Sequence, residues 1–444
     1  MKKKIGLGIL AVILLISASS VFLIQKQSLT EHQKAWISDL EGPFKEVLAS
    51  SAGINENMTE EERNRRIDEI IEAIRTKHWD DERIGYAVKE LISDFQIAHM
   101  QFILCDEYAA QSEYYPIIGK WFGDEYRITE TTPEYEQYIG YAIRKINNLD
   151  MSEVLKRYDT IIPNETQMWL KYSWEYTAKR AGGMRQLDLE YLDIVSKRSD
   201  DLELLLEKEG DSVIVAVAPV AIEDGMEYYS LLDQLQELPM YEKVYWKSGE
   251  APFCYELDEQ NRAFYFQYNE CVDASTAGED SGYPYFDAFF DEMIEQMKEN
   301  SDKYDCFVVD LRGNSGGSTI LINDAISKHW DELAAQKIKL LIGKGTFSAA
   351  VDAIDSFLLA GFDDVTLYGE ETGLAIHNYT DVSGSILPNT GNIVGIVDHE
   401  DWFGVINERA SDLSRGVMPD VEVMQNYDDY VNGIDDVYMK AVEN

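Results

Sequence analysis

The stretch that decides the fold is CFVVDLRGNSGG, residues 306–317, in which an apolar run leads directly into a polar turn that ends in two glycines. The uninterrupted apolar run predicts a strand that is buried on both faces of a sheet. Gly316 and Gly317 let the backbone approach a ligand where a side chain would block it. A buried strand that ends in such a turn is typical of a site that presents backbone N–H groups to a ligand.

A second stretch of the same kind follows. KLLIG, residues 339–343, predicts another buried strand, and GTFSAA, residues 345–350, comes directly after it. Ser348 then lies in a strand-to-helix turn among small residues, where a serine is either a nucleophile or the N-cap of the helix. Neighbouring parallel strands place their carboxyl ends side by side. The N–H groups of Gly316 and Ala349 are therefore predicted to converge on one point, as an oxyanion hole requires.

Strands and helices alternate around these two turns. The pattern predicts strands at 264–268, 306–310, 337–342 and 365–369 and helices at 285–299, 319–334 and 349–359. Such alternation is typical of βαβ units, so the C-terminal part is predicted to be an α/β core with a parallel sheet.

The residues before this core have other patterns. Apolar residues recur at helical spacing from about Glu31 to Leu104, and a mixed pattern with short strands follows. We therefore divide the chain into a signal anchor or signal peptide at 1–27, a helical N-terminal module at 28–110, a mixed β-rich subdomain at 111–255 and the α/β core at 256–444.

The N-terminus has the pattern of an export signal or a membrane anchor. Three lysines, Lys2 to Lys4, precede an apolar run from Ile5 to Ile24. About twenty apolar residues can span a bilayer core, and lysines ahead of them favour an N-terminus inside the cell. We expect a single-pass anchor with the rest of the chain outside the cytoplasm. Small residues at 17–20 leave signal cleavage and secretion as the alternative.

Charge and cysteine content exclude some classes of partner. The net charge of −43 argues against a role on nucleic acid, because phosphate binding needs clustered lysine and arginine. The four cysteines, Cys105, Cys254, Cys271 and Cys306, lack the paired spacing of zinc ligands, and we expect neither a metal nor a cofactor. A disulfide between Cys254 and Cys271 is one option outside the cell.

Five motifs occur in order: VDLRGNSGG at 309–317, GTFSAA at 345–350, GEETG at 369–373, LPN at 387–389 and GVMPD at 416–420. In these motifs the chain resembles the C-terminal processing, or tail-specific, serine peptidases and their relatives, the tricorn core and interphotoreceptor retinoid-binding protein. The resemblance implies a ClpP/crotonase-like α/β core preceded by a helical module and a small β-rich subdomain, for which a degenerate PDZ-like domain is one form. It also implies attack by Ser348 on a peptide carbonyl, with Gly316 and Ala349 as the oxyanion hole.

The base is where the chain departs from the processing peptidases. They carry a lysine shortly after the GEETG-type loop, and GLAIHNYT, residues 373–380, contains none. Lys344 precedes Ser348 at the end of a strand and is expected to be solvated. Relatives without the lysine use a histidine and a carboxylate, and His99 in QIAHMQF, residues 96–102, matches that histidine.

A histidine can take the serine proton when a carboxylate orients its other ring nitrogen. The resemblance assigns this carboxylate to Glu408, with Asp412 as the competing candidate, and His377 is an alternative base. Asn269 and Gly317 are predicted to bind the substrate.

Two functions remain open from the sequence. One is an extracytoplasmic serine endopeptidase that acts on a polypeptide substrate, bound as an added strand, through an acyl-enzyme at Ser348. The other is a catalytically inactive pseudopeptidase that binds extended peptides, which the missing lysine and the altered residues around His99 suggest. The natural substrate and the oligomeric state do not follow from the sequence.

Overall fold

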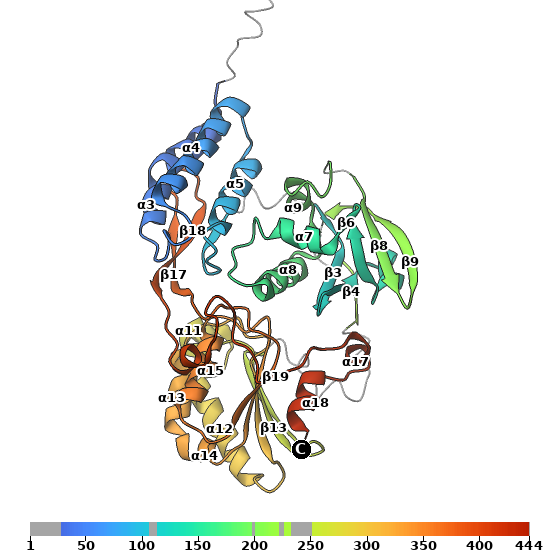
Figure 1. The fold of residues 1–444 in the computed structure, drawn as a ribbon, viewed down its shortest axis with the longest axis vertical. Coiled ribbons are helices and arrows are strands. Elements are labelled where there is room, and N and C mark those ends of the chain that lie inside the picture. The colour runs from blue at the N-terminus through green and yellow to red at the C-terminus, as the bar shows by residue number, and fades with distance from the viewer. Residues whose placement is uncertain (1–27, 106–112, 198–199, 222–225, 232–250, 444) are drawn as a thin grey trace, which may run out of the picture.

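The structure, a computed structural model, describes residues 28–105, 113–197, 200–221, 226–231 and 251–443. The predicted signal or anchor at 1–27 lies outside these residues. No helix within the described ranges is long and apolar enough to cross a membrane. Three parts are visible in Figure 1: N-terminal helices, a β-rich middle part, and an α/β core in which the described chain ends.

The α/β core is built on a six-stranded sheet in the order β12-β13-β14-β15-β16-β19. Strands β13, β14, β15, β16 and β19 are parallel, and β12 pairs antiparallel with β13. The strands are β12 (Phe253–Asp258), β13 (Ala263–Tyr268), β14 (Cys306–Asp310), β15 (Ile338–Ile342), β16 (Val365–Gly369) and β19 (Val421–Glu422). The predicted parallel α/β core is therefore confirmed.

Helices cover both faces of this sheet. Helices α12, α13 and α15 pack on one face, and α18 packs on the other (Figure 1). The helices are α11 (Ala274–Ala277), α12 (Phe286–Glu299), α13 (Ile320–Lys328), α14 (Trp330–Ala334), α15 (Ala349–Leu359), α16 (Val405–Arg409), α17 (Tyr427–Val431) and α18 (Asp436–Val442). The helix predicted at 319–334 is thus two helices, which meet at His329.

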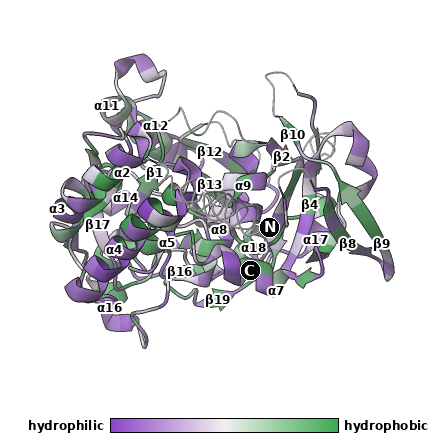
Figure 2. Cartoon of the chain, turned by 90° about the horizontal axis from the view of Figure 1, so that it is seen from above, coloured by the Kyte–Doolittle hydropathy of each residue, from purple (hydrophilic) through white to green (hydrophobic). Residues whose placement is uncertain are grey.

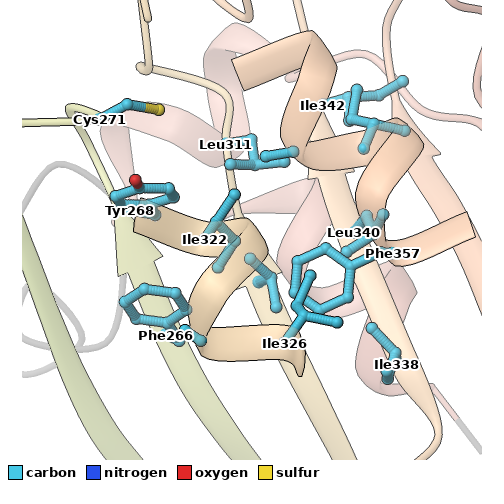
Figure 3. Packing of buried hydrophobic residues seen from close by; sticks show 14 of the residues in the cluster. Phe266, Tyr268, Cys271, Leu311, Ile322, Ile326, Ile338, Leu340, Ile342 and Phe357 are labelled. Atoms are coloured by element: carbon cyan, nitrogen blue, oxygen red, sulfur yellow. The ribbon is translucent and has the colours of Figure 1, made fainter. Parts of the chain in front are cut away.

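The central strand β14 has an apolar sequence up to Val309 because both of its faces are buried. Every residue from Cys306 to Val309 is buried, because helices pack on both sides of the strand. Leu311, Ile322 and Leu340 lie side by side in the core beneath the strand ends (Figure 3), and none of them is exposed. Cys271 is also buried there, and Cys254 and Cys271 form no disulfide in this structure.

The middle part combines a twisted antiparallel sheet with short helices. Its main sheet has the order β11-β4-β5-β8-β9, with β3 paired to β4 and β6 to β5, and a smaller sheet has the order β10-β2-β7. The strands are β2 (Glu113–Tyr115), β3 (Ile117–Phe122), β4 (Glu125–Thr131), β5 (Ala142–Ile146), β6 (Leu149–Asp150), β7 (Met184–Arg185), β8 (Leu202–Lys208), β9 (Asp211–Val217), β10 (Val220–Ala221) and β11 (Tyr229–Ser230). The helices are η1 (Pro133–Tyr138, 3-10), α7 (Met151–Tyr158), α8 (Gln167–Ala181) and α9 (Gln186–Tyr191).

The N-terminal part is helical, as predicted, and includes a hairpin from far along the chain. Its helices are α2 (Glu31–Glu41), α3 (Pro43–Ala49), α4 (Glu60–Lys77) and α5 (Asp81–Ser93), and α4 is hydrophilic over most of its surface (Figure 2). The hairpin of β17 (Tyr379–Ile386) and β18 (Ile393–Glu400) packs against them, and β18 pairs with β1 (Gln101–Ile103).

The LPN motif belongs to this contact. The carboxylate of Asp39, which is fully buried, accepts hydrogen bonds from the backbone and side chains of Asn389 and Thr390 at the hairpin tip. The sequence pattern did not predict this hairpin. Its pairing with β1 fixes the segment that follows His99.

The DLR motif joins the sheet to the C-terminal helix. The Arg312 guanidinium donates to Asp310, from 2.6 Å, and to Asp435, from 2.7 and 2.8 Å. Asp310 and Asp435 are 2% and 1% exposed, and Asp435 also caps α18 by accepting from the Tyr438 N–H. Asp310 and Arg312 therefore have structural roles beneath the site.

We expect Asp435→Ala to lower the free energy of unfolding by about 3–5 kcal/mol, because it leaves the buried Arg312 charge without one of its partners. Urea denaturation followed by circular dichroism measures the change. Asp428→Ala, at an exposed position on the neighbouring α17, is the matched control and should change the free energy by less than about 0.5 kcal/mol. Equal effects of the two substitutions would contradict this role.

Candidate active site

The predicted site residues of the core lie where the parallel strands end. β13 ends at Tyr268, β14 at Asp310 and β15 at Ile342, and these strands are hydrogen-bonded neighbours in parallel register. The turns that follow them carry Asn269, the glycine pair and Ser348. The carboxyl edge of the sheet thus gathers segments that are far apart in sequence, as the βαβ pattern predicted.

Asn314 holds these turns together. It is fully buried, its Oδ1 accepts from the Gly316 N–H at 2.9 Å, and its Nδ2 donates to the Tyr268 carbonyl at 2.9 Å. Its own carbonyl accepts from the Phe347 N–H at 3.0 Å. One side chain and one carbonyl therefore connect the turn after β14 to the end of β13 and to the turn after β15.

The approach of Gly316 to Ser348 requires glycine. Gly316 has φ +107°, and a Cβ there would lie 2.6 Å from the Ser348 Cβ and 3.1 Å from the Ala349 nitrogen. No L side chain fits this space or this backbone conformation without strain. The glycine motif is therefore in direct contact with the serine turn.

Ser348 itself has a strained backbone. Its φ of 54° and ψ of −131° are rare for a residue with a side chain and cost about 1–3 kcal/mol. Ser348 occupies the N-cap position of α15, yet its side chain makes no cap hydrogen bond. The capping role is thus not the reason for a serine here, and the strained turn sets its hydroxyl at the start of the helix.

One predicted oxyanion donor is free and the other is engaged. The Ala349 N–H is the first of α15 and has no hydrogen-bond acceptor within the part of the chain that the structure describes. The Gly316 N–H donates to Asn314 Oδ1. Gly317 faces the Cys271 carbonyl, which would lie 2.3 Å from a Cβ at this position. For the Gly316 and Ala349 N–H groups to form an oxyanion hole together, the Gly316 N–H has to release Asn314 Oδ1 and donate to the substrate oxygen instead.

His99 lies beside the serine turn. Its ring is 4.5 Å from the ring of Phe347, the residue before Ser348. The residue is 7% exposed, and neither ring nitrogen has a hydrogen-bond partner among the described residues. Burial lowers the pKa of His99 to about 4, against the opposing effects of the Tyr379 backbone and the charge of Asp381. The imidazole is therefore neutral at pH 7.

Helix α8 of the middle part covers the serine turn from the other side. Trp169 stacks on Phe347 with ring centroids 3.7 Å apart, and the Thr166 hydroxyl donates to the Gly373 carbonyl of the GEETG motif. Lys344, expected to be solvated, is instead only 12% exposed, and its amine donates to Glu175 at 2.6 Å and to the Trp121 carbonyl at 2.9 Å. This ion pair holds Lys344 against the middle part.

Two acidic groups near the site were not found from the sequence. Glu165 accepts from the Ala98 N–H at 2.7 Å, next to His99, while its other oxygen is buried without a partner. Burial raises the pKa of Glu165 to about 7. Asp352 lies one turn after Ser348 in α15, and burial together with Asp401, Asp355 and Asp381 raises its pKa to about 7. No local sequence pattern marks either residue.

The predicted carboxylates lie elsewhere. Glu408 is exposed on α16, whose first turn is bound to α15 because the Asp355 carboxylate accepts from the Gly404 and Ile406 N–H groups. Asp412 is exposed and accepts from the Ser414 N–H and hydroxyl. Within the described residues, no hydrogen bond joins either carboxylate to His99.

The remaining candidates have structural partners. His377 pairs with Glu56 at 3.2 Å and with Glu400 at 3.3 Å, so both of its ring nitrogens face carboxylates. The Asn269 side-chain amide donates to the Ala251 carbonyl at 2.9 Å. The structure therefore brings Ser348, Gly316 and Ala349 together and places the His99 ring against Phe347, the residue before Ser348.

Comparison with known proteins supports the fold. No protein-family model matches the chain, and no curated protein matches it by sequence. Among solved structures, mature CPAF complexed with lactacystin superimposes with a TM-score of 0.61 at 12% identity, over 91% of this chain and 97% of CPAF. Another structure of mature CPAF gives 0.59 at 13% identity, over 93% and 96%. The chain has the fold of CPAF.

A third solved structure also matches the chain. It is the photosystem II D1 C-terminal processing protease, at 12% identity over 89% of this chain and 94% of that one, with a TM-score of 0.38. The CPAF match and the strand order confirm the predicted α/β core behind a helical module and a small β-rich subdomain. At these identities the comparison shows the fold alone.

We expect Glu165→Gln to change how stability depends on pH. Because burial raises the pKa of Glu165 from 4.5 to about 7, the folded protein binds the extra proton between these values and loses stability as pH rises through 7. The variant lacks this loss, so its free energy of unfolding relative to the wild type should rise by about 2–3 kcal/mol from pH 5 to pH 8.

Urea denaturation at the two pH values measures this difference, in which the contributions of His99 and Asp352 cancel. The exposed Glu299→Gln variant is the control and should show no such change. A pH-independent difference for Glu165→Gln would show that the Glu165 carboxyl titrates as a solvated group.

Proposed function

We propose that the protein is a serine peptidase that cleaves polypeptides through an acyl-enzyme at Ser348. The observation that carries the proposal is the strained Ser348 turn, whose hydroxyl makes no cap bond and whose backbone contacts Gly316. Strain held at one residue by the surrounding structure is typical of active sites. The sequence motifs and the fold shared with CPAF favour the same conclusion.

In the first step the Ser348 oxygen attacks the substrate carbonyl carbon while His99 takes the hydroxyl proton. A neutral imidazole suits this role, since one ring nitrogen can accept the proton while the other is oriented by a carboxylate. The negative oxygen of the tetrahedral intermediate accepts from the Ala349 N–H and, after its release from Asn314, from the Gly316 N–H. The intermediate collapses, and His99 gives its proton to the leaving amine.

Water then hydrolyses the acyl-enzyme by the same route in reverse order. The proton from water goes to His99, and Ser348 recovers its proton when the ester bond breaks. Because His99 is buried, its protonated form is costly in the free protein, so the carboxylate matters most while the imidazolium exists.

We propose Glu408 as that carboxylate, and Asp381 is the second candidate. Helix α16, which carries Glu408, is bound through Asp355 to the helix that begins after Ser348. Glu408 is exposed, so it reaches His99 only after a rearrangement of this short helix. Asp381 is favoured by a different observation, since its charge already acts on His99.

Substrate is proposed to bind in extended form at the carboxyl edge of the sheet, with Asn269 and Gly317 near its backbone. The alternative function is an inactive pseudopeptidase that binds the same peptides. The engaged Gly316 N–H and the unpaired His99 motivate this alternative, because both must change before catalysis. Placement of the chain outside the cytoplasm, by an N-terminal anchor or after secretion, is part of the proposal and rests on the sequence of residues 1–27.

A fluorophosphonate probe tests the nucleophile. We expect the wild type to be labelled and Ser348→Ala to lose labelling, with hydrolysis of quenched fluorescent casein falling by about 10³-fold or more. Ser356→Ala, two turns further along α15, is the matched control and should keep both signals. A wild type that binds casein without labelling or cleaving would support the pseudopeptidase instead.

Paired substitutions test the carboxylate. We expect Glu408→Gln to lower kcat by about 10³–10⁴-fold, as loss of an orienting carboxylate does, and Asp381→Asn to lower it by less than about tenfold. Steady-state hydrolysis of a fluorogenic peptide measures both. A larger loss of kcat in Asp381→Asn than in Glu408→Gln would assign the role to Asp381. If both variants kept the kcat of the wild type, the result would count against a histidine–carboxylate pair.

A further inference from the structure

A cavity lies between the N-terminal helices and the middle part. It has a volume of about 230 Å³ and is bounded by α5, the segment after α7, α8 and the β7–α9 corner. Its lining is largely apolar and includes Ile92, Phe102, Ile161 and Trp174. The rings of Tyr158 and Trp174 stack there with centroids 4.9 Å apart, so part of the wall is a flat aromatic surface.

The charged residues that line this cavity carry a net positive charge. Lys89, Arg185 and Asp188 line the cavity, which gives one more positive charge than negative in a chain of net charge −43. Asp188 accepts a hydrogen bond from the Tyr86 hydroxyl. The Lys89 amine lies 5.0 Å from the Tyr86 ring centroid and has no hydrogen bond or ion pair within the described ranges. Burial lowers the pKa of Lys89, which indicates a poorly solvated ammonium.

The indole nitrogen of Trp174 is closed off from this cavity. Trp174 is 2% exposed, and its Nε1 is buried without a hydrogen-bond partner in the described structure. Buried polar groups without partners are costly and uncommon. Lys89 is a donor of the lining without an acceptor in the described structure, and most of the other lining residues are apolar. A ligand that complements this lining therefore has a hydrogen-bond acceptor, preferably a negatively charged one, attached to an apolar body.

We propose that this cavity binds a small apolar monocarboxylate, with its carboxylate at Lys89 and its hydrocarbon body against Tyr158 and Trp174. A carboxylate would supply the acceptor that the ammonium lacks, and charge-assisted hydrogen bonds are the stronger kind. A cavity of about 150 Å³ holds benzene, so this volume suits on the order of nine non-hydrogen atoms. Arylacetic acids and medium-chain fatty acids are of this class.

Phenylacetate is the probe, and the full-length protein is titrated by isothermal calorimetry and by Trp fluorescence. We expect saturable one-to-one binding. Lys89→Met, which keeps most of the apolar stem, should weaken it at least tenfold, and Lys156→Met, at an exposed lysine on α7, should leave it unchanged. Phenethylamine, which has the same body and the opposite charge, should not saturate.

A steric variant keeps the test independent of Lys89. Thr177 lines the cavity from an exposed position on α8, so Thr177→Trp should fill the mouth and abolish binding while circular dichroism remains that of the wild type. Absence of saturation by phenylacetate at millimolar concentration, or equal affinity of Lys89→Met and wild type, would overturn the proposal. Ser348→Ala should bind as the wild type does, so the result does not depend on the peptidase proposal.

Discussion

The site depends on the hydrogen bonds of one buried asparagine. Asn314 accepts from the Gly316 N–H, donates to the Tyr268 carbonyl and, through its own carbonyl, receives the Phe347 N–H. These three bonds set the spacing of three strand ends, and that spacing brings Gly316 against Ser348. The same interaction occupies a donor that peptide cleavage needs. In the proposed reaction, the substrate oxygen therefore replaces Asn314 Oδ1 as the acceptor of the Gly316 N–H, and this is one of the hydrogen bonds that build the site in the free protein.

The middle part contributes to the site as directly as the core does. Helix α8 stacks Trp169 on Phe347 and binds Gly373 through Thr166, while Lys344 is held by Glu175. Phe347 thus contacts both α8 and His99, so the serine turn is confined by groups from all three parts of the chain. This enclosure buries His99 and Glu165. Burial lowers the pKa of His99 and raises the pKa of Glu165, so both side chains favour their neutral forms.

The sequence predicted what depends on local pattern and missed what depends on distant contacts. The strand at 306–310 was predictable because both of its faces are buried, and the Ser348 turn because small residues follow a buried strand. The hairpin at Tyr379–Glu400 was missed, since most of β17 is exposed and shows no apolar alternation. Glu165 and Lys344 were missed or misjudged because their partners, Ala98 and Glu175, are remote in sequence.

A crystal structure of the protein with a peptide aldehyde tests the central claim most directly. The account predicts a covalent bond from Ser348 Oγ to the aldehyde carbon, with the resulting oxygen within hydrogen-bond distance of the Ala349 and Gly316 nitrogens and Asn314 Oδ1 displaced from Gly316. A peptide bound at the carboxyl edge of the sheet without a bond to Ser348, and with the Asn314–Gly316 hydrogen bond intact, would contradict it.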